Sequence, residues 1–241
     1  MKHQRTLFEY LVRLLCLLLG LFILAQGLAF TLLADLGTDA ITSPALVAHL
    51  VLGTSEGGLG YEFCTAGTML ICVHIILVLL QIVLLRSKYR PIQLLQILNG
   101  LVLGFMLDIC LSYTSLLPLP NYATAISYTL LGCVFCAFGI FTFVKADLVP
   151  LSAEGLCLAL SHTFSWRFSR VKVGVDCSML AIAVLASLIL LGTVVGVREG
   201  SIICAVSVGF LIGWFFKVFP YWDKLFAAVS DQKETDNSEL A

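Results

Sequence analysis

Long apolar runs with few charges dominate this sequence, and they restrict it to folds that a lipid bilayer can surround. Each run has close to the ~20 residues that a helix needs to cross the hydrocarbon core. The runs occupy residues 11–34, 63–85, 92–113, 122–144, 174–196 and 201–219. Hydrophobic residues make up 60% of the chain and charged residues 12%, whereas a soluble domain has about 25% charged residues. We therefore expect an all-α membrane protein with six transmembrane helices, and we exclude a soluble or disordered chain.

Basic residues fall on alternate sides of these runs. If the N-terminus is cytoplasmic, cytoplasmic segments hold every one of the 14 Lys and Arg residues except Arg198, as the positive-inside rule requires. The loop 34–62 contains no Lys or Arg, whereas 86–90 and 167–172 are rich in them. We expect both termini in the cytoplasm, and a net charge of −1 predicts no nucleic-acid partner.

Two further apolar stretches, 38–52 and 151–165, are too short to span a bilayer and contain polar residues. Their length favours half-membrane helices. After the last span the chain becomes polar, and we expect a disordered tail at 227–241.

Sequence features recur in the same order in two halves of the chain. Ala-Asp-Leu at 34–36 returns at 146–148, and a Gly-x3-Gly pair at 100–104 returns at 209–213. Each half holds three spans and one short helix, so the second half must enter the membrane from the opposite side. We expect two inverted repeats, an architecture common in transporters, whose sites lie near broken helices at the midplane. The predicted repeats cover residues 1–118 and 119–226.

Acidic residues flank the two points where a helix is interrupted. Asp35 and Asp39 flank Gly37, and Asp147 and Glu154 flank Pro150. Charged groups inside a bilayer are costly and commonly functional. Either the helix N-termini bind a substrate anion, or the acids bind a cation or a proton; ordinary helix caps at the interfaces would also explain these acids. The predicted substrate- or proton-binding residues are Asp35, Asp39, Asp147, Glu154, Ser43, Ser152, Gln26 and His74.

Three stretches together resemble the YczE/YyaS/YitT family of bacterial integral membrane proteins. They are the Ala-Asp-Leu-Gly turn at 34–37 that leads into Ser43-Pro44, the Gly-rich final span, and Arg-Glu-Gly-Ser-Ile-Ile at 198–203. The family usually has Thr where Ser201 stands. Because only a short polar tail follows the last span, the chain resembles the YczE branch, without the soluble domain often found in the YitT branch. The resemblance covers residues 10–220 and implies a multi-pass protein of a bacterial inner (cytoplasmic) membrane and transport, without naming a substrate.

Two functions remain open. The first is a secondary transporter of a small polar organic solute, coupled to protons at Asp35, Asp147 or Glu154. It would explain why each repeat has three spans and why acidic residues flank the helix interruptions. A non-transporting membrane partner, either a substrate-capture subunit or an accessory factor for a biosynthetic enzyme, would use the basic loops 86–90 and 167–172 for docking. The lipid bilayer surrounds the chain in both cases, and a homo-oligomer or a partner membrane protein fits either. No phosphate loop, His-Glu-x-x-His or nucleophile elbow occurs, so we expect no enzyme, cofactor or metal.

Overall fold

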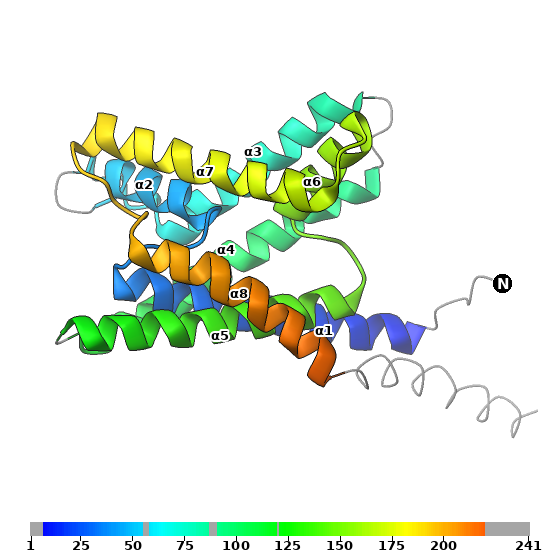
Figure 1. Cartoon of the computed structure of the whole chain (residues 1–241), viewed down its shortest axis with the longest axis horizontal. Coiled ribbons are helices and arrows are strands. Elements are labelled where there is room, and N and C mark those ends of the chain that lie inside the picture. The colour runs from blue at the N-terminus through cyan, green and yellow to red at the C-terminus, as the bar shows by residue number, and fades with distance from the viewer. Residues whose placement is uncertain (1–6, 55–57, 87–90, 120, 220–241) are drawn as a thin grey trace, which may run out of the picture.

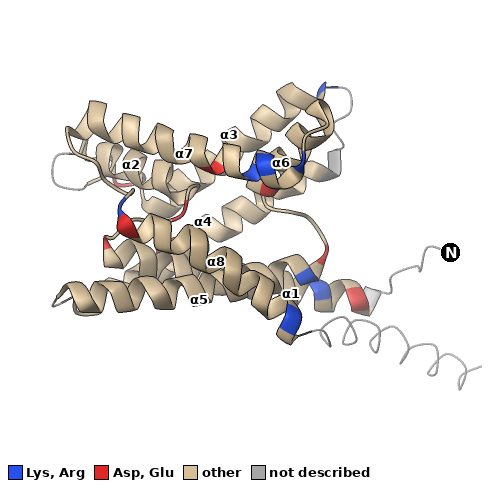
Figure 2. Cartoon of the chain, viewed as in Figure 1, with Lys and Arg blue, Asp and Glu red and all other residues tan. Residues whose placement is uncertain are grey.

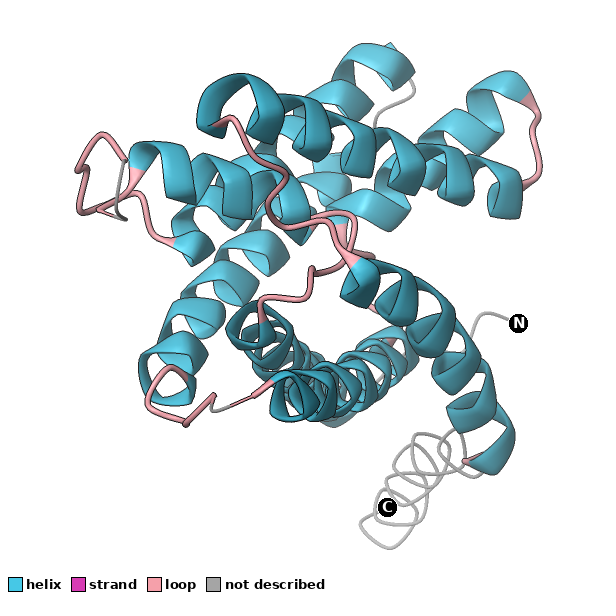
Figure 3. Cartoon of the chain, turned by 60° about the vertical axis from the view of Figure 1, so that its left-hand side comes forward, coloured by secondary structure: helices cyan, strands magenta, loops and turns pink. Residues whose placement is uncertain are grey.

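The structure is a computed structural model that describes residues 7–54, 58–86, 91–119 and 121–219. The described residues form helices and loops and contain no strand (Figure 3). The elements are α1 (Leu7–Ala34), α2 (Thr42–Leu52), α3 (Ala66–Leu85), the 3-10 helix η2 (Pro91–Leu94), α4 (Leu95–Thr114), α5 (Tyr122–Ala146), α6 (Ser152–Phe164), α7 (Phe168–Leu191) and α8 (Glu199–Val218). The predicted tail at 227–241 lies outside the described residues, as does most of the basic loop 86–90.

Six of these helices, α1, α3, α4, α5, α7 and α8, are long and apolar enough to cross a membrane. This confirms the six predicted spans, and α2 and α6 confirm the two short helices. The prediction for α7 was wrong at both ends. The helix begins at Phe168 rather than 174, because Arg170 and Lys172 belong to its first turns, and it ends at Leu191, where Gly192 takes a left-handed φ of 71°.

The helices form two groups, one with α2, α3, α6 and α7 and the other with α1, α5 and α8, and α4 contacts helices of both (Figure 1). α1 packs along α5, α4 packs on α1, and α8 packs on α5. Each of the short helices α2 and α6 contacts both α3 and α7. In Figure 1, α2, α6 and α7 lie above α1, α5 and α8. Both short helices thus pack with α3 and α7, in the group opposite α1, α5 and α8.

Glycines bring the backbones of α1 and α5 into direct contact. A Cβ atom added at Gly139 would lie 2.5 Å from the backbone nitrogen of Leu24, and one added at Gly27 would lie 2.5 Å from that of Cys136. No side chain tolerates such an approach, so only glycine permits this packing. Small residues at helix contacts are the usual means of close association in membranes. The α1–α5 pair therefore forms the central contact of the fold.

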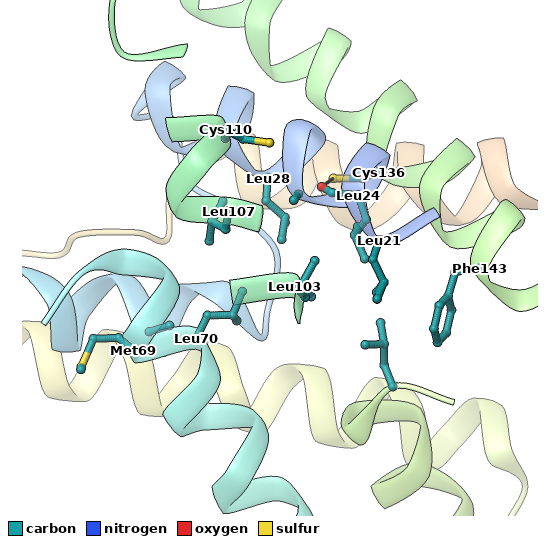
Figure 4. Close-up of a cluster of buried hydrophobic side chains, with 14 of the residues drawn as sticks. Leu21, Leu24, Leu28, Met69, Leu70, Leu103, Leu107, Cys110, Cys136 and Phe143 are labelled. Atoms are coloured by element: carbon teal, nitrogen blue, oxygen red, sulfur yellow. Dashed lines mark hydrogen bonds between the residues drawn. The ribbon is translucent and has the colours of Figure 1, made fainter. Parts of the chain in front are cut away.

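Buried leucines extend the α1–α5 contact to α4. Figure 4 shows Leu21, Leu24 and Leu28 of α1 beside Leu103 of α4, with Phe143 of α5 at one end of the cluster. These side chains are almost completely buried. Their packing fixes α1 between α4 and α5.

The outer faces of the helices are apolar. Val83, Ile189, Ile202 and Phe210 are each at least 70% exposed, and Figure 2 shows that most of the helical surface carries no charge. A soluble protein rarely exposes such large continuous apolar surfaces. Together with the six long apolar helices, they define a multi-pass membrane protein in contact with lipid.

We predict that Gly139→Ala lowers the thermal unfolding midpoint of the detergent-purified protein. The new Cβ would meet the backbone of α1, and overpacking costs about 1–3 kcal/mol, where about 1 kcal/mol corresponds to 2–4 °C in a chain of this size. The matched control is Gly213→Ala on α8, whose Cβ meets nothing within 4 Å. Its midpoint should stay unchanged or rise, because Ala favours a helix over Gly. Equal effects of the two changes would contradict the close α1–α5 contact.

Candidate functional site

A cavity of about 390 Å³ lies where the two short helices begin. Its wall includes residues 39–42, which lead into α2, and Leu151, Ala153 and Glu154 at the start of α6. Side chains from each of the six long helices complete the wall. The volume is within the range of small-molecule sites, which is about 300–1,000 Å³.

Three acidic side chains and one basic side chain lie on this wall. They are Asp39, Glu154, Lys172 and Asp176. The ammonium nitrogen of Lys172 lies 2.9 Å from Oδ1 of Asp176, one helical turn further along α7. The cavity therefore presents three carboxyl groups and one ammonium group, and the ammonium group is already in contact with one of the three.

Asp39 stands just before the start of α2. Its Oδ2 accepts a hydrogen bond from the backbone N–H of Ile41 at 3.2 Å, and the hydroxyl of Thr38 lies 3.5 Å from its Oδ1. Burial raises the pKa of the Asp39 carboxyl above its ordinary value, although the hydrogen bond from the Ile41 N–H and the charge of Lys172 act in the opposite direction. Desolvation therefore favours the protonated form of this acid.

Glu154 lies in the first turn of α6. Its Oε2 atom is buried and finds no hydrogen-bond partner among the described residues. Burial raises the pKa of the Glu154 carboxyl, and the nearby Lys172 charge offsets only part of the shift. A buried oxygen without a partner costs free energy, so this position is a candidate for binding a proton or a ligand.

His74 connects the start of α6 to α3. Its Nδ1 forms a short hydrogen bond with the hydroxyl of Ser152. The side chain is only 2% exposed and lines the cavity, yet its Nε2 has no partner in the described part of the chain. Ser152 is the first helical residue of α6, not its N-cap, which is Leu151.

Side chains from α3 and α4 bind the backbone of the second interruption. The amide nitrogen of Gln81 donates to the carbonyl of Ser152 at 2.8 Å, and that of Asn99 donates to the carbonyl of Val149 at 3.2 Å. Backbone groups away from water need such partners. These polar residues of the spans therefore support the site from outside the cavity.

The segment before α8 and the first turn of α8 bind the first interruption in the same way. The carbonyl of Gly196 accepts from the backbone N–H of Thr38 at 3.2 Å and from the hydroxyl of Ser43 at 3.1 Å. The N–H of Gly200 donates to the carbonyl of Leu36 at 2.7 Å. Gly37 adopts a left-handed φ of 100°, and a Cβ there would lie 2.5 Å from Oγ of Ser201, so this turn requires glycine.

The structure brings together three of the predicted site residues, Asp39, Glu154 and His74, on the cavity wall. Ser152 acts through His74, and Ser43 donates to the Asp39 carbonyl at 2.8 Å. These two serines thus support the site without lining it.

Asp35 and Asp147 do not line the cavity. They end α1 and α5 in the left-handed conformation, with φ of 52° and 48°, and both are exposed. Asp tolerates this conformation better than most residues. Their matching positions in the two halves thus reflect how two helices end.

Gln26 lies away from the cavity and connects α1 to α4. Its amide nitrogen donates to Oγ1 of Thr114 at 3.1 Å, and its oxygen accepts from the hydroxyl of Tyr113. The residue therefore holds two spans together.

Lys172 and Asp176 are the site residues that sequence reasoning missed. The basic residues of 167–172 predict a cytoplasmic loop, so the predicted span begins at 174, after Lys172. The i, i+4 spacing of Lys172 and Asp176 was the available signal. An ion pair at this spacing can lie inside a membrane-spanning helix, where an isolated charge would be costly.

Fold and cavity together define a class: a multi-pass membrane protein in which two short helices begin at a shared, partly charged cavity. Residues 11–217 match the model of a protein family described as a "Family of unknown function (DUF6198)". Since the match covers most of the sequence, the chain belongs to this family. Neither a curated protein nor a solved structure matches the chain.

We predict that Glu154→Gln raises the unfolding midpoint at about pH 8 and has little effect at about pH 5. Because burial raises the pKa of Glu154, the stability that this acid contributes is fully present below its unfolded pKa and is lost as pH rises through the folded pKa. Gln removes that loss, and a gain of about 1 kcal/mol corresponds to 2–4 °C. Exposed Asp35→Asn is the control and should change neither value. A lower midpoint for Glu154→Gln at the higher pH would show that the charge stabilises the fold.

Proposed function

We propose that this chain is a secondary transporter of a small polar organic solute, coupled to protons, in a bacterial inner membrane. The observation that carries the proposal is the shared cavity at the start of two short helices, with Asp39 and Glu154 on its wall. Discontinuous helices that begin at a central site are a recurring feature of secondary transporters. The sequence resemblance to the YczE branch agrees with this role.

The pattern of helix contacts supports the inverted repeat of residues 1–118 and 119–226. In an inverted repeat, helices α1 to α4 correspond to helices α5 to α8 in order. The contact of α1 with α4 then corresponds to that of α5 with α8, and the contact of α2 with α3 corresponds to that of α6 with α7. The contact of α2 with α7 corresponds to that of α6 with α3. Each of these pairs packs together. The left-handed residues Asp35 and Asp147 end the first helix of each half. The start of α1 and the end of α8 also lie on the same side of the molecule (Figure 1), as an even number of spans requires.

The two halves differ most at one pair of helices, and this difference suggests how access alternates. α3 and α4 pack closely, with Gly67 directly against Gly104, whereas Gly174 of α7 and Gly213 of α8 have open space where a Cβ would stand. In the described residues, α7 and α8 do not pack along each other. If the halves exchanged conformations, α7 and α8 would close on these glycines while α3 and α4 separated.

The direct test is transport by purified protein in liposomes that contain a pH-sensitive dye. A broad panel of small polar organic solutes is added outside, and we expect at least one to move protons only when the protein is present. Protein carrying Glu154→Gln should lose the proton movement, and protein carrying Asp35→Asn should keep it. No proton or solute movement across the panel would contradict the transporter, and the role of a non-transporting partner would then be tested by co-purification.

We predict that Gly174→Leu and Gly213→Leu each slow transport about tenfold or more and leave the unfolding midpoint unchanged. A Cβ atom added at either glycine meets nothing within 4 Å apart from its own helix in this conformation. The fold therefore accepts the new side chain. In the closed arrangement of α7 and α8 the leucine would overpack the contact, at about 1–3 kcal/mol, and about 1.4 kcal/mol is tenfold in rate.

The control for these variants is Cys72→Leu, an exposed position on α3, which should keep the full transport rate. Full rates in both glycine variants would contradict closure of α7 on α8.

A further inference from the structure

We propose that the cavity binds an organic cation, an ammonium group on an apolar body, and that Asp39 and Glu154 hold the ammonium group. The inference rests on the proposed transport function and names the substrate class of the same site. It follows from four features of the cavity: its balance of charge, the occupied ends of its helices, its unpartnered atoms and its apolar walls.

The balance of charge on the wall is negative. Asp39, Glu154 and Asp176 oppose Lys172 alone, and Lys172 is 2.9 Å from Asp176. Because this pair neutralises itself, two carboxyl groups remain for a ligand. A positively charged group would satisfy them, whereas an anion would add to the repulsion.

The positive ends of α2 and α6, which would otherwise attract an anion, already face acids of the chain. The N–H of Ile41, the residue before α2, donates to the Asp39 carboxylate at 3.2 Å, and the N–H of Ser43 donates to the Asp39 carbonyl at 3.0 Å. Glu154 lies in the first turn of α6, so its carboxyl group stands near the positive end of that helix. A helix N-terminus binds an anion through free N–H groups and partial positive charge. At the start of α2 the Asp39 carboxylate already occupies one such N–H group, and at the start of α6 the chain places its own acid, Glu154, in the first turn.

Two buried polar atoms at the cavity lack partners among the described residues, and they are the second indication of a ligand. Oε2 of Glu154 and Nε2 of His74 are both buried and unpaired, and the His74 side chain is only 2% exposed. Buried polar atoms are almost always hydrogen-bonded. An ammonium group has several N–H donors and would supply the donor that the carboxyl oxygen lacks.

The remainder of the wall is apolar and comes mainly from the long helices. It includes Leu24 and Leu28 of α1, Leu103 of α4, Ile140 of α5 and Val208 of α8. A bare ammonium ion would leave most of the 390 Å³ unfilled. An apolar body attached to the charged group would fill it and would gain free energy from the apolar contacts.

Protons and the cation compete for the same carboxyl groups. The titratable groups that face Glu154 are Asp39, His74 of α3, Cys157 of α6, and Lys172 and Asp176 of α7. Protonation of Glu154 or Asp39 removes the charge that holds an ammonium group. Cation affinity should therefore fall as pH decreases, and binding of the cation in exchange for protons follows without any further group.

The test is calorimetric binding to the purified full chain, with probes that share an apolar body and differ in charge. Phenethylammonium is compared with 2-phenylethanol and phenylacetate, and cyclohexylammonium with cyclohexanol and cyclohexanecarboxylate. We expect at least one ammonium probe to bind with a Kd below about 1 mM and about tenfold more tightly than its neutral and anionic analogues. Its affinity should be higher at about pH 8 than at about pH 5.

The variants Asp39→Asn and Glu154→Gln should each weaken binding about tenfold. Asp35→Asn, an exposed carboxylate outside the cavity, should bind like the unchanged protein. The unfolding midpoint of each variant is measured at the same pH, and Asp39→Glu, which keeps a carboxyl group at this position, should bind more tightly than Asp39→Asn; equal binding by these two variants would contradict the role of the charge.

Three results would overturn the cation site. They are no binding of either ammonium probe, binding of a neutral or anionic analogue as tight as that of the ammonium, and full affinity in both carboxyl variants. Ammonium binding without flux in liposomes would contradict transport and retain the cation site. Flux of another solute without ammonium binding would contradict the cation site and retain transport.

Discussion

The hydrogen-bonding needs of two interrupted helices determine how the rest of this structure is arranged. Backbone groups away from water must find partners inside the protein. At the first interruption they find Gly196, in the segment before α8, and Gly200, in the first turn of α8. At the second they find polar side chains of α3 and α4, Gln81 and Asn99. Each interruption thus binds helices that are distant in the sequence, and the cavity lies where these attachments converge.

The cavity is also the place where the fold departs from what stability alone would favour. The α1–α5 contact is dense, because glycines at positions such as 27 and 139 let two backbones touch. Beside it, Glu154 and His74 leave buried atoms without partners among the described residues. Local sequence rules are usually broken at functional positions and compensated elsewhere. A tightly packed helix pair next to a costly, charged cavity is consistent with this division.

The sequence predicted the elements better than the site, for identifiable physical reasons. Apolar length and the placement of basic residues identify spans, because the bilayer acts on each helix separately. Asp39, Glu154 and His74 could be found as polar residues near the breaks or within a span. Asp35 and Asp147 lie outside the cavity at left-handed helix ends, and the sequence alone does not distinguish an acid that ends a helix from one that lines a cavity. Lys172 was missed because its charge indicates a cytoplasmic loop, whereas in the structure α7 begins before it, at Phe168.

The proposed cation site and the proposed alternation of α7 and α8 depend on the same physical term, the cost of burying a charge. An ionised carboxyl in a closed, water-poor cavity is costly unless a proton or a cation neutralises it. Closure over an empty, ionised cavity is therefore disfavoured, whereas closure over a proton or an ammonium group is not. Only the loaded forms would then pass between the two arrangements of the helices. On this account, Asp39 and Glu154 couple the two movements because neither carboxyl is easily buried as a bare charge.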